Sequence, residues 1–464
     1  MIKNIINITD FGAVANSGEL QTKKIQASID KCFELGGGEV IVPAGKYRTG
    51  DLRLRSNVTL HLLENAYLSG SENPEDYFNY LDDEVEPLTK EQITDAPYVH
   101  LSTIHGETEY VDGKPEYRFK RIPGSRWNNA IIRAIDAENI KVIGEKNSVI
   151  DGVNCFDEIG EEEYRGPHGM TFFNCRNIEL KGYTIQNTGN WAHNLLFCTN
   201  ISVENITVLA GHDGFDAAVC TNLSITDSEF YTGDDCVAGF GNVNTSVRSC
   251  VLNSSCSAMR FGGSNVLVEK CHIYGPGKYC FRGSLSDDDK RNSAPSVTEG
   301  NRNNMLSAFT YYADYSLPIE VAPGNIVIAD CKIDNANRFL HYNYSGNEIW
   351  QKNRPLESIC FKNIKATDIC MPLTAYGDKD IPVTVELLNV DLSIQKGFES
   401  IDFMHAANYK KIVLENVSLK NFKGKSLIKT WSDGGKTEIK NLNCGIDEKN
   451  YVTKAEESFV CQAI

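Results

Sequence analysis

The segments NIELKGYTIQNTG (177–189), NISVENITVLAG (200–211) and NLSITDSEFYTGDD (222–235) repeat one pattern. Each begins with an asparagine, alternates apolar and polar residues, and ends in turn-forming residues. The pattern continues in NTSVRSCVLNSSC (244–256) and NVLVEKCHIYGPG (265–277), so that successive leading asparagines are 23, 22, 22 and 21 residues apart. A fixed period of roughly 20–50 residues indicates a solenoid, whose units bury their apolar faces against their neighbours.

Each unit holds short β-branched strands broken by Gly, Asn, Asp and Ser, with little helical periodicity. Three such strands form one coil of a parallel β-helix, and coils stack at the strand spacing of roughly 4.8 Å. The pattern also occurs at residues 139–152 and returns at 325–337, 358–369 and 409–422. We therefore predict an all-β fold, a right-handed parallel β-helix that forms a single domain over residues 1–464.

The N-terminal part, residues 1–75, is expected to hold a cap and the first coils. Apolar residues at helical spacing from residue 21 to 35, ended by Gly36–Gly38, predict a short capping helix. A solenoid needs such a cap at its open end. Residues 76–128 and 283–320 interrupt the repeat, and we expect both to be loop insertions near the cleft.

The chain has 15 cysteines, an odd number, and no apolar run of signal-peptide type at its N-terminus. This combination favours reduced thiols and predicts a cytoplasmic location. No stretch approaches 18 apolar residues, so no membrane-spanning segment is expected. Six cysteines occupy fixed positions of the repeat, which predicts that they face the core: Cys175, Cys198, Cys220, Cys250, Cys271 and Cys331.

The formal net charge of −16 argues against nucleic acid or an anionic membrane as a partner. An acidic substrate would need a local basic patch on this chain. The sequence gives no indication of the oligomeric state.

Two aspartates hold equivalent positions in consecutive units. Asp213 and Asp235 each lie 13 residues after a repeat asparagine, so we expect them to stack one coil apart with Asp234 beside them. Three carboxylates in one place repel, which raises the proton affinity of at least one. A protonated acid beside an ionised base is what glycoside hydrolysis requires. The alternative for a lone Gly-Asp-Asp is an ordinary solvated turn.

The same counting aligns three other polar residues. His193, Asp216 and Arg260 each lie 16 residues after a repeat asparagine, which predicts a stack beside the carboxylates. We interpret them as substrate-binding residues. Aromatic residues that are candidates for stacking on a sugar are Trp191, Tyr311, Tyr312, Tyr342 and Tyr344.

The order of the motifs WAH (191–193), GHDGFD (211–216) and GDDC (233–236) resembles glycoside hydrolase family 28, the polygalacturonase-like right-handed β-helix enzymes. The segment that begins ITDFGAVANSG at residue 8 is similar to the cap and first coils of that family, and the resemblance spans most of residues 7–282.

The resemblance implies a glycosidase that inverts the anomeric carbon in a single displacement, without a metal or other cofactor. It implies that Asp234 is the general acid and that Asp213 and Asp235 hold the attacking water.

The substrate-gripping motifs of the family are altered in this chain. The coil that normally carries Gly-His-Gly reads SSCSAMRFGG (254–263), and the Arg-Ile-Lys motif is replaced by KYCFRGS (278–284), which keeps one arginine. A guanidinium suits bidentate carboxylate binding, so other basic groups nearby are candidates to compensate. The predicted substrate-binding residues are His193, His212, Asp216, Arg260, Lys278 and Arg282.

The favoured function is an intracellular, exo-acting, inverting glycosidase of a pectin-type or related oligosaccharide, for which a uronic-acid-containing sugar is a candidate. The sugar and the linkage stay open. The first alternative is a β-helix polysaccharide lyase that uses Ca²⁺ held by the aspartates and an Arg or Lys base. The second is a non-catalytic carbohydrate-binding β-helix.

Overall fold

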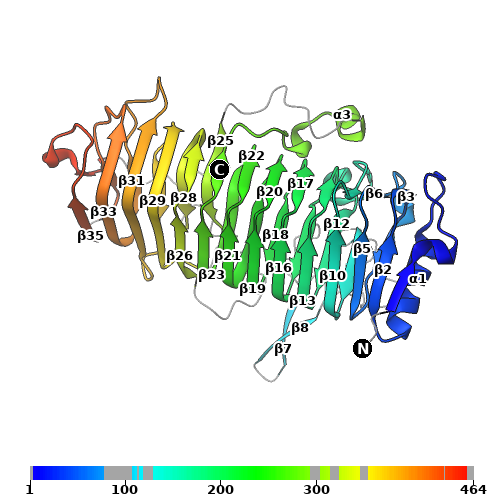
Figure 1. Cartoon of the computed structure of the whole chain (residues 1–464). Helices are drawn as coiled ribbons and strands as arrows, with labels where there is room; N and C mark the ends of the chain where they lie inside the picture. The colour runs from blue at the N-terminus through cyan, green and yellow to red at the C-terminus, as the bar shows by residue number, and fades with distance from the viewer. Residues whose placement is uncertain are drawn as a thin grey trace.

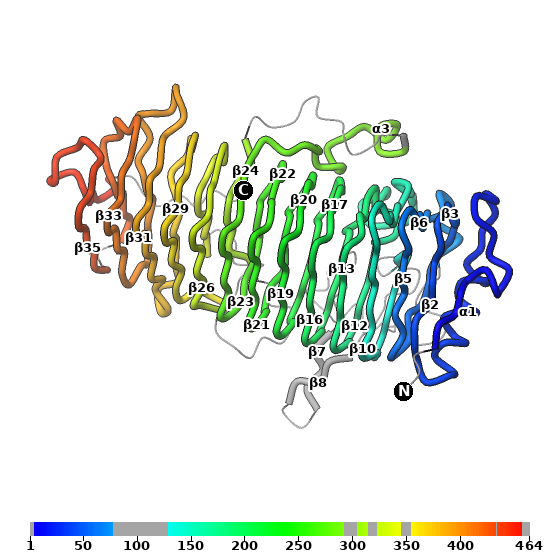
Figure 2. Tube along the Cα trace, viewed as in Figure 1, coloured from blue at the N-terminus to red at the C-terminus, as the bar shows by residue number. Residues whose placement is uncertain are grey.

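Strands that stack in parallel dominate the computed structural model (Figures 1 and 2). The structure describes residues 4–77, 107–111, 114–118, 129–292, 304–313, 323–344, 354–432 and 434–456. Most of the predicted insertion 76–128 and about half of the predicted insertion 283–320 lie outside these residues. Within the first insertion, β7 (Glu107–Val111) and β8 (Lys114–Arg118) pair as an antiparallel hairpin.

Each coil contributes a strand to three parallel columns, which we call the site sheet, the second sheet and the third sheet. The site sheet contains β4 (Leu52–Arg53), β9 (Ala130–Ile135), β12 (His168–Phe173), β15 (His193–Leu196), β18 (Phe215–Ala218), β25 (Met305–Tyr311), β28 (Ala336–Asn343), β30 (Leu373–Tyr376), β32 (Met404–Ala407), β34 (Ile428–Thr430) and β36 (Val452–Lys454). The second sheet contains β1 (Asn4–Asn7), β2 (Gly38–Val42), β5 (Val58–Leu62), β10 (Glu138–Gly144), β13 (Arg176–Lys181), β16 (Thr199–Glu204), β19 (Thr221–Thr226), β26 (Gly324–Ala329) and β35 (Lys436–Lys440).

The third sheet contains β3 (Gly45–Arg48), β6 (Ala66–Ser69), β11 (Val149–Asp151), β14 (Thr184–Gln186), β17 (Thr207–Ala210), β20 (Glu229–Thr232), β22 (Val251–Ser254), β24 (His272–Tyr274) and β27 (Lys332–Asp334). Two long strands run from the site sheet into the second sheet: β21 (Val237–Arg248) and β23 (Ser257–Glu269). Three others run from the second sheet into the third: β29 (Ser358–Ile369), β31 (Val383–Ile394) and β33 (Tyr409–Lys420). The predicted all-β, parallel β-helix is confirmed.

The repeat asparagines form a hydrogen-bonded ladder along the stack. Asn200 Nδ2 donates to Asn177 Oδ1 at 3.0 Å, Asn222 to Asn200 at 2.9 Å, and Asn244 to Asn222 at 3.1 Å. All four have a left-handed backbone, with φ between 57° and 59°. Asparagine tolerates this conformation better than most residues do. The ladder is therefore the physical origin of the period seen in the sequence.

The inside of the coil is one continuous apolar core that runs from Ile6 to Cys444. The six cysteines predicted to face the core are at most 3% exposed. Their thiols donate to backbone carbonyls, as Cys198 does to Leu196 O at 3.4 Å and Cys220 to Ala218 O at 3.5 Å. Core packing of these residues is confirmed, and the 14 cysteines that the structure describes are all free thiols.

The predicted capping helix is α1 (Thr22–Glu34), at the N-terminal end of the stack (Figure 1). Ile25, Ile29 and Cys32 form its fully buried face. After the helix, Gly37 has a φ of +100°, and a Cβ there would lie 2.4 Å from Asn57 O. Only glycine therefore allows the chain to approach the next coil so closely. No helix in the described ranges is long and apolar enough to cross a membrane.

Candidate active site

Two rows of side chains cross the coils of the site sheet side by side. Strand pairing at offsets of 22 residues aligns Phe215 with Val237 and Val237 with Met259, which fixes the register of both rows. The aspartate row runs through Asp213, Asp235, Ser257, Ser307 and Arg338. The arginine row runs through Asn194, Asp216, Ala238, Arg260, Thr310 and His341.

The turns that precede β18 and β21 bring three carboxyl groups together. Oxygen atoms of Asp213, Asp234 and Asp235 all lie within 4.8 Å of one another. Asp213 Oδ1 accepts a hydrogen bond from the Asp235 N–H at 3.2 Å, and Asp235 Oδ1 accepts one from the Ser257 N–H at 2.9 Å. The structure thus brings together the three aspartates that the sequence predicts to converge.

Burial controls the charge of this cluster. Asp213 is 4% exposed and Asp235 is 2% exposed, whereas Asp234 is only half-buried. Burial, followed by repulsion from Asp234 and Asp235, raises the pKa of Asp213 well above its usual value. Burial, with repulsion from Asp234, raises the pKa of Asp235 to about 7. The cluster therefore retains a proton near neutral pH, and Asp234 is its member most open to solvent.

The arginine row places two charged groups next to the aspartates. Asp216 and Arg260 stand two strand spacings apart with Ala238 between them, as the sequence predicts. Burial raises the pKa of Asp216 to about 7, and Arg260 acts in the opposite direction. The Arg260 guanidinium lies 3.9 Å from the ring centroid of Tyr312, and none of the described carboxylates lies within ion-pair distance of it. Arg260 is therefore available to an anionic substrate.

His193 does not face the substrate side, contrary to the prediction. Asn194 pairs with Asp216, so His193 is one residue out of the expected register and points into the core, where it is fully buried. Its Nδ1 donates to Gly214 O at 2.9 Å, and its Nε2 accepts from the Tyr183 hydroxyl at 3.0 Å. His193 thus positions the turn that carries Asp213. Asn194 takes the predicted place on the outer face.

His212 and Arg282 are also interior residues, which corrects their prediction as substrate contacts. The fully buried His212 ring stacks on Tyr164, with centroids 5.7 Å apart. Arg282 is 3% exposed, and its guanidinium donates to the carbonyls of Gly189 and Asn154 at 2.9 and 2.7 Å and to that of Lys290. These bonds fasten the segment after β24 across neighbouring turns.

The segment KYCFRGS (278–284) does not contribute a strand to the site sheet. The strand that follows β23 there is β25, and β25 contains neither arginine nor lysine. Lys278 is exposed, with its ammonium 3.5 Å from the ring centroid of Tyr231, so its contact with substrate stays a prediction. Of the tyrosines proposed for stacking, Tyr311 and Tyr342 are buried in the core.

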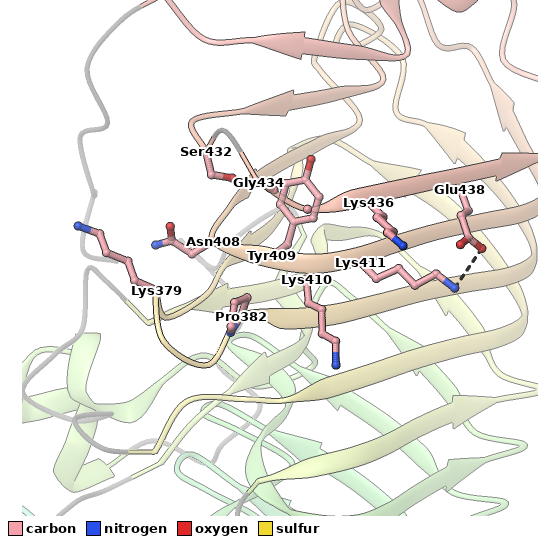
Figure 3. A pocket seen from close by; sticks show the side chains of 11 residues that line it. Lys379, Pro382, Asn408, Tyr409, Lys410, Lys411, Ser432, Gly434, Lys436 and Glu438 are labelled. Carbon is pink, nitrogen blue, oxygen red and sulfur yellow. Dashed lines mark hydrogen bonds and ion pairs between the residues drawn. The ribbon is translucent and has the colours of Figure 1, made fainter.

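A separate hollow of about 800 Å³ lies at the turns of the last coils (Figure 3). It contains none of the predicted site residues. Its one lining carboxylate, Glu438, pairs with Lys411 at 3.0 Å, so the hollow offers no pair of free carboxyl groups for acid–base chemistry. Its lining includes four lysines, Lys379, Lys410, Lys411 and Lys436.

Fold and site together define a right-handed parallel β-helix protein with a carboxylate cluster on one sheet. Residues 99–258 match the model of glycosyl hydrolases family 28. A probable polygalacturonase of Vitis vinifera is 25% identical over 244 residues, which cover 50% of this chain and 43% of the relative. An exo-poly-alpha-D-galacturonosidase of Dickeya chrysanthemi is 29% identical over 266 residues, which cover 52% of this chain and 43% of the relative. Each match spans less than half of the relative's length.

The crystal structure of a hyperthermoactive exopolygalacturonase from Thermotoga maritima has a TM-score of 0.62 with this chain at 19% identity. The superposition covers 90% of this chain and 92% of that chain, and it confirms the right-handed parallel β-helix. These matches confirm the resemblance carried by the motifs. The chain is therefore similar to polygalacturonases, and residues 99–258 are similar to glycosyl hydrolases family 28.

Proposed function

We propose that the protein is a glycosidase that hydrolyses a uronic-acid-containing oligosaccharide of the pectin type. The observation that carries this proposal is the cluster of three carboxyl groups within 4.8 Å, beside an arginine that forms no ion pair with a described carboxylate. The cluster supplies an acid and a base, and the arginine supplies a partner for a uronate carboxylate. The galacturonan-degrading activities named for the two relatives support this substrate class.

In the proposed reaction, Asp234 donates its proton to the glycosidic oxygen as the bond from the anomeric carbon to that oxygen breaks. Asp213 and Asp235 hold a water molecule, which attacks the anomeric carbon and gives a proton to one of them. Burial favours the retained proton on Asp213 and Asp235, so the proposed cycle includes its transfer within the cluster to Asp234, the most solvent-open member, before the glycosidic bond breaks. Proton transfer within the cluster then restores the starting state.

The proposal also specifies the stereochemical outcome at the anomeric carbon. The carboxyl oxygens lie closer together than the roughly 6.5–9.5 Å typical of inverting pairs. A single displacement with inversion requires the water to attack the face of the anomeric carbon opposite the leaving oxygen, so the anomeric carbon must lie between the acid and the held water. We propose inversion, which the resemblance to family 28 implies.

We also propose that the enzyme is exo-acting and works on short oligosaccharides inside the cell. The 14 free thiols support a reducing compartment. The exo-acting relative from Dickeya chrysanthemi supports the mode of action.

Release of reducing sugar from a panel of pectic and neutral oligosaccharides tests the function. The wild-type protein is expected to release saturated sugar from a galacturonate oligosaccharide, and Asp234→Asn is expected to lower kcat at least about a hundredfold. The matched control is Asp227→Asn, because Asp227 has a φ of 49° in a turn, where asparagine fits equally well. Equal activity of Asp234→Asn and wild type would contradict the proposal.

The close approach of three carboxylates also favours a second candidate function, a Ca²⁺-dependent lyase, since carboxylate oxygens are the ligands of that ion. A lyase yields an unsaturated product that absorbs in the ultraviolet, and a chelator abolishes its activity. Release of saturated sugar that persists in EDTA would eliminate this candidate.

A further inference from the structure

Arg338 is a cation on the outer face of the site sheet with no anionic partner among the residues that the structure describes. It follows Ser307 in the aspartate row, three strand spacings or about 14 Å from Asp235. Its side chain is half-buried, and no carboxylate of the described residues lies within ion-pair distance. Among the described residues, its buried Nε atom has no hydrogen-bond partner, and its Nη1 atom lies 3.2 Å from His341 Nδ1.

The residues next to Arg338 offer hydrogen-bond donors to a ligand instead of acceptors. Arginine can only donate, so His341 Nδ1 must be the unprotonated, accepting nitrogen of a neutral ring. The Thr374 hydroxyl lies 2.6 Å from the same nitrogen, which gives it a second donor. The His341 proton is then on Nε2, which adds an N–H donor beside the guanidinium. Burial, followed by the charge of Arg338, lowers the pKa of His341 to about 3, so the ring stays neutral.

Ser307, the strand partner of Arg338, completes the set. Its Oγ is buried and has no hydrogen-bond partner among the residues that the structure describes. A half-buried guanidinium without a carboxylate and a buried hydroxyl without a partner are both unfavourable. An anion that accepts several hydrogen bonds would relieve both.

We propose that Arg338, with His341 and Ser307, binds the carboxylate of a uronate unit of the substrate that is distant from the cleaved bond. This inference rests on the proposed function for its substrate class. The strand between them, β25, lacks arginine and lysine, so Arg260 and Arg338 are the cations of the two coils that flank it on this face. The chain thereby binds an acidic oligosaccharide at two positions that lie two strand spacings, about 10 Å, apart along the stack of coils.

The test uses the full chain with Asp234→Asn, which prevents turnover. Isothermal titration calorimetry measures the Kd for galacturonate oligosaccharides of two and of six units. Adding Arg338→Gln is expected to weaken binding of the hexamer about 10- to 100-fold, as for the loss of a hydrogen bond to a charged group, and to leave the dimer unchanged. Arg338→Lys is expected to recover part of the loss, because it keeps the charge without the planar fork.

The control is Arg248→Gln on β21, which removes an exposed arginine from the second sheet and should change neither Kd. A methyl-esterified hexamer lacks the carboxylates, so its Kd should be the same for the Arg338→Gln variant and for its parent. Equal losses for dimer and hexamer, or no loss for either, would overturn the assignment. Binding is measured without hydrolysis, so a protein that binds through Arg338 but never cleaves would refute the proposed function and leave this inference intact.

Discussion

Asp213 and Asp235 stand directly over one another in consecutive coils, and Asp213 Oδ1 accepts a hydrogen bond from the Asp235 N–H at 3.2 Å. The backbone continues the contact, since the Gly214 N–H donates to Asp235 O at 2.9 Å. The strand spacing of the solenoid therefore fixes the separation of the two carboxyl groups. A parallel β-helix makes this arrangement by placing equivalent residues of successive coils in register.

Replacing a carboxylate of this cluster should stabilise the protein while it abolishes activity. Burial raises the pKa of Asp235 to about 7, so between pH 4 and 7 the folded chain binds more protons than the unfolded chain does. Stability due to this group is thus lost as pH rises. We expect Asp235→Asn to unfold with a free energy on the order of 1–3 kcal/mol higher than wild type at pH 8, and with little difference at pH 4.

Urea denaturation followed by circular dichroism at both pH values measures this difference. A variant that is less stable than wild type at pH 8 would show that the carboxylate contributes favourable interactions that exceed the repulsion.

Arg260 should tune both substrate binding and the pH profile. Its charge opposes the rise in pKa of Asp213, Asp216 and Asp235. Arg260→Gln should therefore move the acidic limb of the kcat/KM profile up by about one pH unit and raise KM for a uronate substrate about tenfold. Arg248→Gln is the control for loss of a positive charge. An unchanged profile with a normal KM would remove Arg260 from the site.

His193 should affect catalysis only by positioning the turn that carries Asp213. His193→Phe removes the bond to Gly214 O and leaves the Tyr183 hydroxyl with only its 3.8 Å contact to Met170 Sδ, at a cost of about 2–4 kcal/mol in stability. We expect kcat to fall more than KM changes. Tyr183→Phe removes only the second bond and should affect kcat less. If KM rises tenfold with kcat unchanged, His193 contacts the substrate after all.

The same histidine gives a pH dependence of opposite sign to that of Asp235. Burial lowers the pKa of His193 to about 4, so between pH 4 and 6.5 the unfolded chain binds more protons and stability is lost as pH falls. The stability difference between wild type and His193→Phe should therefore be largest at pH 7 and should shrink toward pH 4. Urea titrations at pH 4, 5 and 7 check this trend, which a constant difference would contradict.

The asparagine ladder predicts that two substitutions of Asn222, by glycine and by alanine, destabilise the protein to different extents. Alanine loses two ladder bonds and must adopt a φ near 59°, which costs roughly 1–2 kcal/mol beyond the bonds. Glycine loses the same bonds without backbone strain. The melting temperature should therefore be highest for wild type, lower for Asn222→Gly and lowest for Asn222→Ala. A glycine variant at or below alanine would show that the backbone conformation contributes nothing.

The spacing of the asparagines was sufficient to predict the fold and the aspartate cluster, because the coils that begin at Asn200 and Asn222 have equal length. It was insufficient for His193, whose coil begins at Asn177 and is one residue longer. A shift of one residue turns a side chain to the other face of a strand. Asn194 was missed for the same reason.

The order of segments along the sequence also gave a wrong prediction of neighbouring strands where the chain leaves the stack of coils. KYCFRGS follows CSAMRFGG in the sequence, but the next strand of the site sheet, β25, begins only at Met305. Arg338 lies one coil further on, and only strand pairing shows that it shares a row with Asp235. Sequence spacing therefore predicts neighbours within an unbroken run of equal coils and loses them at each insertion.

The most direct test of the central claim is proton NMR of the products during the first minutes of cleavage of an α-linked galacturonate oligosaccharide. The account predicts a saturated product whose new reducing end appears first as the β-anomer, and it predicts no product from Asp234→Asn. A reducing end that appears first as the α-anomer would contradict the single displacement, and the vinyl signal of an unsaturated sugar would contradict hydrolysis.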